Sequence, residues 1–362
     1  MKQSYEHQDY LIIGFGITGC MVAHELSKRG RSFTVVDAGE NAASYAAGWL
    51  INPVTGLRFV KSWRVQELLP VAKSTYLDLE HRWNLSLWHS LQVMRVFRDK
   101  KEAERWRWRC QREDMRDYVA NEWQGDNGYA AVKPDFGGIL IDQAAWINIP
   151  LLLEKTRSLL LAQGAYIKAS VAPDELKIMD DGVLYKNFIF KKVIFCTGYG
   201  RQWPWFDWLP WKPAKGETLT LRVKDWPHEW HHTVLNCGIF MLPILETESA
   251  SEKLVRVGAT YEWHDLNTQP TISGKNSLLE QIDRLIDLDY EVIDHRAGIR
   301  PIIKDTRPVV GQHPDPLCKN FFLLNGMGSK GALWAPYCTK LLINHIENGV
   351  SIDSEVDVQR NL

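Results

Sequence analysis

Residues 9–30 of the chain read DYLIIGFGITGCMVAHELSKRG, and residues 32–37 read SFTVVD. The apolar run before Gly14 predicts a short buried strand, and the stretch after the glycines predicts a helix that begins near Thr18 and ends at Gly30. The second apolar run predicts another buried strand. A strand, a helix and a strand in so short a stretch form a β-α-β unit, which predicts a parallel sheet with helices packed on it.

Three glycines stand between the predicted strand and helix with the spacing G-x-G-x-x-G. Gly14 allows the tight turn, Gly16 lets a pyrophosphate approach the backbone, and Gly19 lets the helix pack closely on the strand. Ile17 and Thr18 begin the helix, whose N-terminal N–H groups can face negative charge. In this context the pattern predicts a dinucleotide-binding site.

Asp37 ends the second predicted strand, near the spacing of about twenty residues at which this motif expects a carboxylate. We expect Asp37 to accept hydrogen bonds from the adenosine ribose. The glycine motif fits both NAD and FAD, so the choice between these cofactors depends on the rest of the chain.

The chain has 362 residues, of which 45% are hydrophobic and 24% are charged. This length predicts two domains. No apolar run approaches the roughly 18 residues of a membrane span, and the polar N-terminus leaves no room for a signal peptide, so we expect a cytoplasmic protein. The net charge of -1 gives no general attraction to nucleic acid.

No metal site is expected. The six cysteines include no C-x-x-C pair, which argues against a zinc site or a disulfide framework. Residues 228–232 read HEWHH and match the zinc motif H-E-x-x-H. That motif binds zinc on a helix, whereas Pro227 and the strand patterns on either side predict a loop here, so we reject a zinc protease.

One basic segment stands out from the neutral average. Between Arg95 and Arg116 the chain has nine Lys/Arg and five Asp/Glu, with Trp106 and Trp108 among them. A nucleic-acid patch is one interpretation, but we favour a solvated helix whose long side chains cover apolar surface, and nucleic acid is not an expected partner. Other tryptophans cluster in Pro-containing segments, where we expect loops over a cavity or an interface, at 201–211 and 225–230.

Beyond residue 40 the periodicity changes several times. Residues 60–120 are helix-like and rich in charge, which suggests an insertion. Residues 216–257 alternate between apolar and polar with hairpin-length breaks, which predicts a second, largely antiparallel sheet. Helical segments are predicted at 151–164 and 331–348, and strand-like segments at 134–141, 165–171 and 188–200.

Several segments resemble one family when they are taken in order. The D-amino-acid oxidase superfamily, and within it bacterial glycine oxidase, has similar stretches at matching places. The resemblance leaves about 61–133 unmatched. The matching segments are SYAAGWLINP (44–53), IFCTGYG (194–200), PAKGETLTL (213–221), FMLP (240–243), VGATYEW (257–263), AGIRPIIKDTRPVVGQHP (297–314) and NGMGSKGALWAP (325–336).

This resemblance implies FAD as the cofactor and an α/β fold. It implies a doubly wound, Rossmann-like FAD-binding domain and a second substrate domain built on a largely antiparallel sheet. We place the FAD-binding domain at 1–60, 140–212 and 296–362. The discontinuous substrate domain takes 61–139 and 213–295.

The resemblance also assigns residues to the cofactor. Ser44 and Gly48 would lie at the phosphates and the flavin ring, and Val171 would contact the adenine through its backbone. Thr197 and Gly198 would lie along the pyrophosphate. A turn before the last helix would face the pyrimidine edge of the flavin, where negative charge develops on hydride uptake. The residues of this turn are Gly328, Ser329, Lys330 and Gly331.

For the substrate, the resemblance points to Arg300, because the arginine of the matching G-x-R-P motif pairs with the substrate carboxylate. A guanidinium makes that pairing bidentate. A structural arginine paired with an internal aspartate is the alternative. The implied reaction is oxidation of the C–N bond of glycine, an N-substituted glycine or a D-amino acid to an imine, with hydride transfer to flavin N5 and dioxygen or a quinone as electron acceptor.

Two positions depart from glycine oxidase and make glycine itself a doubtful substrate. Phe240 replaces a tyrosine, so one hydrogen bond to the substrate carboxylate is absent, and the bulkier Tyr261 lines the pocket. Lys304 could assist dioxygen but is expected to be solvated. No role follows from spacing for three polar residues after the flavin loop, Asn52, Arg58 and Lys61.

Three other functions are kept open. The same superfamily includes the oxidase domain of a bifunctional enzyme that acts on a carboxymethylaminomethyl group of tRNA wobble uridine. A flavin-binding module without catalysis is the second, although Arg300 argues against it. An NAD-dependent dehydrogenase is the third, and it leaves the segment GMGSKG (326–331) without a purpose.

Overall fold

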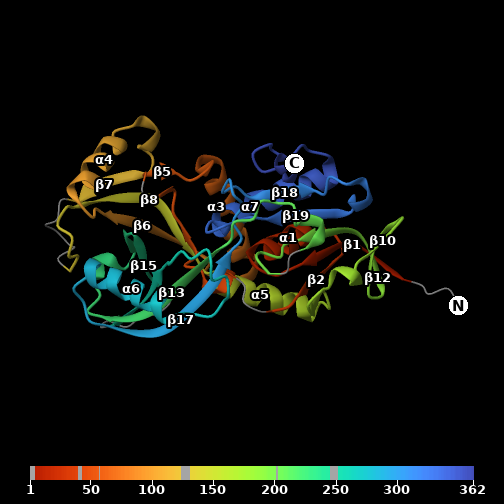
Figure 1. Ribbon diagram of the computed structural model, residues 1–362, viewed down its shortest axis with the longest axis horizontal. Helices are drawn as coiled ribbons and strands as arrows, with labels where there is room; N and C mark the ends of the chain where they lie inside the picture. Colours follow the sequence, from red (N-terminus) through yellow and green to blue (C-terminus); the bar gives the residue numbers. More distant parts are fainter. Residues whose placement is uncertain (1–4, 40–42, 57, 124–130, 201–202, 245–251) are drawn as a thin grey trace.

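The β-α-β unit predicted near the N-terminus forms strand β1 (Glu6–Ile13), helix α1 (Ile17–Lys28) and strand β2 (Phe33–Asp37). The structure is a computed structural model. It describes residues 5–39, 43–56, 58–123, 131–200, 203–244 and 252–362. Figure 1 shows that the chain builds two bodies around two β-sheets, with β1, β2 and β12 on the right and β6, β8, β13 and β17 on the left.

The first sheet has eight strands in the order β10-β11-β12-β1-β2-β9, with β19 paired to β12 and β18 paired to β19. Its centre is parallel: β1 pairs with both β2 and β12, and β12 pairs with β19. The remaining strands are β9 (Tyr166–Lys168), β10 (Lys177–Met179), β11 (Gly182–Tyr185), β12 (Phe188–Phe195), β18 (Val309–Gln312) and β19 (Phe321–Asn325).

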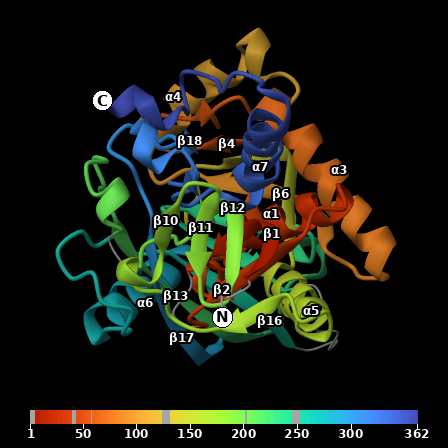
Figure 2. The ribbon, with the colours of Figure 1, turned by 90° about the vertical axis from the view of Figure 1, so that its right-hand side faces the viewer.

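Successive residues of β1 face opposite sides of this sheet. Tyr10 and Ile12 belong to the core with helices α1, α5 (Ile149–Ala162) and α7 (Gly331–Asn348). Leu11 and Ile13 belong to a second core with the tryptophan-rich segment, through Trp203, Phe206 and Leu209. Figure 2 shows β10, β11 and β12 toward the viewer, with α5 and α7 beside them.

The second sheet has nine strands in the order β17-β13-β16-β15-β14-β6-β8-β3, with β7 on β8. Neighbouring strands of this sheet are antiparallel, except that β14 and β6 run parallel. Helix α6 (Ile272–Leu285) covers one face. The strands are β3 (Leu50–Ile51), β6 (Trp88–Val96), β7 (Val119–Trp123), β8 (Gly138–Ile147), β13 (Ala214–Lys224), β14 (Thr233–Cys237), β15 (Ile239–Pro243), β16 (Glu252–Gly258) and β17 (Tyr290–Arg300).

The stretch from 60 to 120 is not wholly helical, because it contains β6 and β7 besides two helices. Pairing with β8 and β14 on either side holds β6 in the sheet, although one of its buried residues is the charged Arg95. The remaining helices are α2 (Ala43–Ala46), α3 (Val65–Trp83), which packs against α7, and α4 (Lys100–Cys110), and the hairpin consists of β4 (Val54–Thr55) and β5 (Val60–Lys61).

The proposed domain division has boundaries between residues 60 and 61, 139 and 140, 212 and 213, and 295 and 296. Strand β8 crosses the boundary at 139 and pairs with β6, strand β17 crosses the boundary at 295 and pairs with β13, and β3 pairs with β8. The boundaries therefore cut through two strands of the second sheet. Apolar alternation predicts a strand but does not show which sheet the strand joins.

Candidate active site

A cavity of about 540 Å³ lies where the two sheets meet, at the carboxyl ends of β1, β2 and β12. Ligands bind at this edge in open α/β sheets. The cavity brings together residues from both ends and the middle of the chain. The predicted site residues that line it are Gly14, Gly16, Ile17, Thr18, Asp37, Ser44, Gly48, Val171, Thr197, Gly198, Phe240, Tyr261, Arg300, Gly328, Ser329, Lys330 and Gly331.

Gly19 is the predicted residue outside this lining, and its place explains its small size. A Cβ atom on Gly19 would lie 2.0 Å from the carbonyl oxygen of Gly14. Gly14 itself has a φ of +97°, and a Cβ there would lie 2.6 Å from the carbonyl oxygen of Cys196. The two glycines therefore pack the turn between α1 and β12, as predicted for the first and third positions of the motif.

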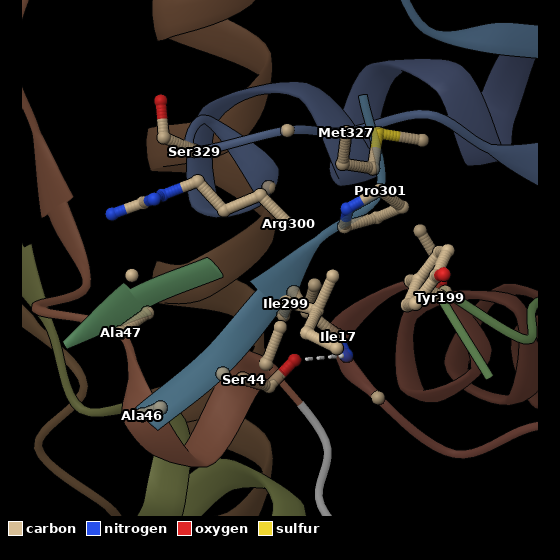
Figure 3. Close-up of a pocket in the computed structure, with 18 of the residues that line it drawn as sticks. Ile17, Ser44, Ala46, Ala47, Tyr199, Ile299, Arg300, Pro301, Met327 and Ser329 are labelled. Atoms are coloured by element: carbon tan, nitrogen blue, oxygen red, sulfur yellow. Dashed lines mark hydrogen bonds between the residues drawn. The ribbon is translucent and has the colours of Figure 1, made fainter. Parts of the chain in front are cut away.

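The N-terminus of α1 faces the cavity. The backbone N–H of Ile17 donates to Ser44 Oγ at 3.1 Å, the bond drawn in Figure 3. A Cβ on Gly16 would lie 3.2 Å from the same oxygen, so the second glycine keeps the loop and the turn close together. The remaining N–H groups of the first helical turn have no partner within the helix, which suits a pyrophosphate.

Asp37 lies at the end of β2, on the cavity wall. Its Oδ1 accepts from the backbone N–H of Phe15 at 2.8 Å, and its Oδ2 accepts from the Tyr166 hydroxyl at 3.1 Å. Burial, and then the charge of Asp37, raise the pKa of Tyr166 to about 12, so this hydroxyl stays a donor. The carboxylate therefore braces the glycine turn, and its remaining lone pairs can accept from a ribose.

Lys330 precedes α7, and its ammonium group has no acidic partner among the described residues. Its Nζ donates to Thr55 Oγ1 at 3.0 Å and to Ser62 Oγ at 2.7 Å. Burial lowers the pKa of Lys330 to about 8. A cation held by two hydroxyls leaves positive charge on the cavity wall beside the N-terminus of α7. No sequence pattern indicates Thr55 and Ser62, because they are far from Lys330 along the chain.

Arg300 ends β17, and its guanidinium lies against the backbone of β13. A Cβ on Gly216 would lie 2.1 Å from Arg300 Nη2. Arg300 Nη1 donates to the carbonyl oxygens of Lys215 and Thr260, each at 3.2 Å. In Figure 3 the side chain points away from Tyr199 and from the Ile17–Ser44 pair. Burial lowers the pKa of Arg300, and within the described chain no carboxylate forms an ion pair with it.

Two aromatic rings shape the space near Arg300. The Arg300 guanidinium lies 4.0 Å from the ring centroid of Tyr261, whose side chain is partly exposed. Phe240 packs against Gly48, where a Cβ would lie 2.4 Å from the ring, and against Gly258. Phe240 therefore requires the absence of a side chain at Gly48.

The three polar residues without an assigned role separate into two groups. Asn52 lines the cavity, and its Oδ1 accepts from the Val54 N–H at 3.1 Å. Arg58 is exposed, and Lys61 lies 3.6 Å from Asp114 as an ion pair; neither lines the cavity. Lys304 does not line the cavity either.

The motif at 228–232 does not form a helix. Residues His228–Trp230 make a single 3-10 turn between β13 and β14, so two histidines four apart do not share a helical face. No group of potential metal ligands occurs among the described residues.

In the basic segment, Trp106 is 1% exposed and stacks on Phe59, whereas Trp108 is 63% exposed.

The glycine turn, the parallel sheet and the cavity between the two sheets define a dinucleotide-binding fold. A family model described as FAD dependent oxidoreductase, DAO, matches residues 9–345, and the chain belongs to this family. It is therefore an FAD-dependent oxidoreductase enzyme, and FAD is its cofactor. The residues that line the cavity fit that group, because they supply open backbone, a helix N-terminus and a terminal carboxylate where a dinucleotide needs them.

Two solved structures share this fold. Glycine oxidase from Bacillus cereus has a TM-score of 0.74 and 18% identity over 95% of this chain and 96% of that one. Iminodiacetate oxidase from Chelativorans has a TM-score of 0.71 and 19% identity over 96% and 97%.

A curated relative is the tRNA 5-methylaminomethyl-2-thiouridine biosynthesis bifunctional protein MnmC of Hahella chejuensis, which is 25% identical over 98% of this chain. The chain spans only 59% of that relative's length.

Among the described residues, no helix is long and apolar enough to cross a membrane.

Proposed function

We propose that the enzyme oxidises the C–N bond of a small amine that carries a carboxylate, such as glycine, an N-substituted glycine or a D-amino acid, to an imine. The observation that carries this proposal is Arg300, a half-buried guanidinium without a described acidic partner, in the same cavity as the dinucleotide turn. An arginine that lines a cavity and lacks an anion is a ready partner for a carboxylate.

The side chains of the cavity then have distinct tasks. Arg300 holds the carboxylate through Nε and Nη2, since Nη1 is already committed to two backbone carbonyls. Tyr261 covers the guanidinium, and Phe240 keeps water from the reacting carbon. When bound, FAD supplies the hydride acceptor, flavin N5.

No strong base is required of the chain. The neutral amine forms the C=N bond with its lone pair as the hydride leaves the adjacent carbon, and the amine proton passes to water. The imine is then released and hydrolysed. The contribution of the protein is orientation and the exclusion of water.

The test is anaerobic bleaching of the flavin absorbance of the purified holoenzyme. Glycine, N-alkylglycines, D-amino acids and cyclic imino acids are added in turn, and at least one of them should bleach the flavin. Admitting oxygen afterwards, with and without a quinone, identifies the electron acceptor from the rate of reoxidation. If none of these amines bleaches a protein that does contain FAD, the small-amine proposal is wrong.

A second candidate is oxidation of a carboxymethylaminomethyl group on tRNA wobble uridine, an amine that also carries a carboxylate. The match of MnmC to 98% of this chain favours it. The exposed Trp108, with the basic residues around it, would contact the RNA. Bleaching by the modified tRNA, together with no response to small amines, would select this candidate.

A further inference from the structure

One row of residues crosses the second sheet and forms part of the cavity wall. Thr218 is opposite Gly258, Gly258 is opposite Phe240, and Phe240 is opposite Asn236 in successive strand pairs. Asn236 is in turn opposite Arg95 on β6. Directly opposed residues face the same side of a sheet. Thr218, Gly258, Phe240 and Asn236 line the cavity. Arg95 is the last residue of the row and does not line it.

Arg95 fixes the orientation of the Asn236 amide. Arg95 is buried between the ring of Trp106, with its guanidinium 4.4 Å from the ring centroid, and the carboxylate of Glu102 at 3.5 Å. Its Nη1 donates to Asn236 Oδ1. A guanidinium has donors only, so the amide oxygen must face Arg95 and the NH₂ group must face the other way.

Asn236 is the member of this row that offers a free donor to the cavity. The Thr218 hydroxyl donates to the carbonyl oxygen of Ala46 at 2.9 Å. Gly258 has no side chain, and Phe240 is apolar. Asn236 Nδ2 has no hydrogen-bond partner among the described residues, and the side chain is partly accessible from the cavity it lines.

The donor and Arg300 lie over different strands of the second sheet. Arg300 sits over β13, whereas Asn236 is on β14, with β16 and β15 between them in the sheet. Three strand spacings correspond to about 14 Å between the two backbones, which the two side chains shorten only in part. Glycine, with one carbon between its amine and its carboxylate, is too short to contact both.

We propose that Asn236 is a specificity-determining residue, which donates a hydrogen bond from Nδ2 to an acceptor on the second substituent of the amine. The substrate class is then an N-substituted glycine whose N-substituent ends in a carbonyl or a carboxylate. This inference rests on the proposed function, because Arg300 holds the glycine carboxylate. Arg95 acts through Asn236 and is a positioning residue.

The test measures binding by calorimetry to the holoenzyme with ether analogues, which have oxygen in place of the amine. Methoxyacetate has one carboxylate, and 3-(carboxymethoxy)propanoate adds a second acceptor on the other arm. The wild-type protein should bind the longer ether at least about tenfold more tightly, as one well-oriented hydrogen bond to a charged group allows. Asn236→Leu should remove this preference and leave methoxyacetate binding unchanged.

Controls separate this role from a structural one. Asn187→Leu, a change of the same type at an exposed turn far from the cavity, should keep the wild-type preference. If Asn236→Leu does not fold, Asn236→Asp keeps the contact with Arg95 and removes the donor, and it should also lose the preference. An unchanged preference in either variant, or an equal loss for both ethers, overturns the proposal.

The outcomes for Asn236 and for the proposed function differ. If the preference depends on Asn236 but no amine bleaches the flavin, the binding role stands and amine oxidation fails. If amines bleach the flavin and the preference is the same without Asn236, amine oxidation stands and the role of Asn236 fails.

Discussion

The guanidinium of Arg300 lies so close to the backbone of Gly216 that a Cβ atom on Gly216 would be 2.1 Å from Nη2. The glycine thus determines where the only cation proposed to hold the substrate carboxylate can rest. Lys215 and Glu217, on either side of Gly216, are buried on the opposite face of β13. Strand β13 therefore buries Lys215 and Glu217 on one face and contacts Arg300 through Gly216 on the other.

Gly216→Ala should displace the Arg300 guanidinium without affecting FAD. We expect substrate or carboxylate affinity to fall at least about tenfold, since a bidentate pairing does not tolerate a shift of this size. The FAD affinity, measured by fluorescence titration of the FAD-free protein, should not change. In a double-mutant cycle, Gly216→Ala should add no further loss to Arg300→Ala. An additive loss would show that Gly216 acts elsewhere.

Gly48→Ala should destabilise the protein by about 1–3 kcal/mol, the usual cost of overpacking. The new methyl group would lie 2.4 Å from the Phe240 ring. Phe240→Leu in the same chain should recover most of the loss, because the smaller side chain leaves room. Urea unfolding of the two single variants and the double variant checks this. No recovery in the double variant would mean that another contact of Gly48 dominates.

Lys330→Met should stabilise the FAD-free protein at pH 7. Burial lowers the pKa of Lys330 from 10.5 to about 8, so below pH 8 the folded protein bears the cost of a buried charge, up to about 3 kcal/mol. Between pH 8 and 10.5 the folded protein holds fewer protons than the unfolded chain, and wild-type stability gains relative to the variant as pH rises.

Urea unfolding of both FAD-free proteins at pH 7 and pH 9.5 measures this difference. The advantage of Lys330→Met should narrow at the higher pH. An advantage that stays constant would show that the Lys330 ammonium is solvated in the folded protein.

The two tryptophans of the basic segment should behave differently. Trp106 is 1% exposed and stacks on Phe59, so Trp106→Ala should cost about 3–5 kcal/mol of stability. Trp108 is 63% exposed, so Trp108→Ala should stay within about 0.5 kcal/mol. Chemical denaturation compares them directly. Equal losses would contradict the packing of α4 on the β4–β5 hairpin.

Local signals were sufficient for much of the fold. The strand, glycine turn and helix around Gly14 were predicted from periodicity and turn chemistry, and the last helix was predicted at 331–348, as α7 shows. Strand β6 was missed because its place depends on long-range pairing with β8 and β14. Local signals also do not show which sheet β8 and β17 join, for the same reason.

For the site too, local sequence signals predict some residues, and others depend on contacts between distant segments. The ordered segments predicted which residues would meet in one cavity, and all but the packing residue Gly19 line it. Asn236 was not predicted, since its orientation depends on Arg95, which belongs to another strand and is far away in the sequence. A short polar residue in a strand gives no signal until its register partners are known.

The central claim is that an amine with a carboxylate is oxidised in this cavity while Arg300 holds the carboxylate. Rapid mixing of the anaerobic holoenzyme with the amine that bleaches it gives the substrate Kd and the rate of flavin reduction. Arg300→Ala should raise the Kd at least about thirtyfold, the loss expected when one partner of a buried charge pair is removed, while Arg284→Ala on the exposed face of α6 should not change it. If Arg300→Ala reduces its flavin with the wild-type Kd and rate, the account of the site is wrong.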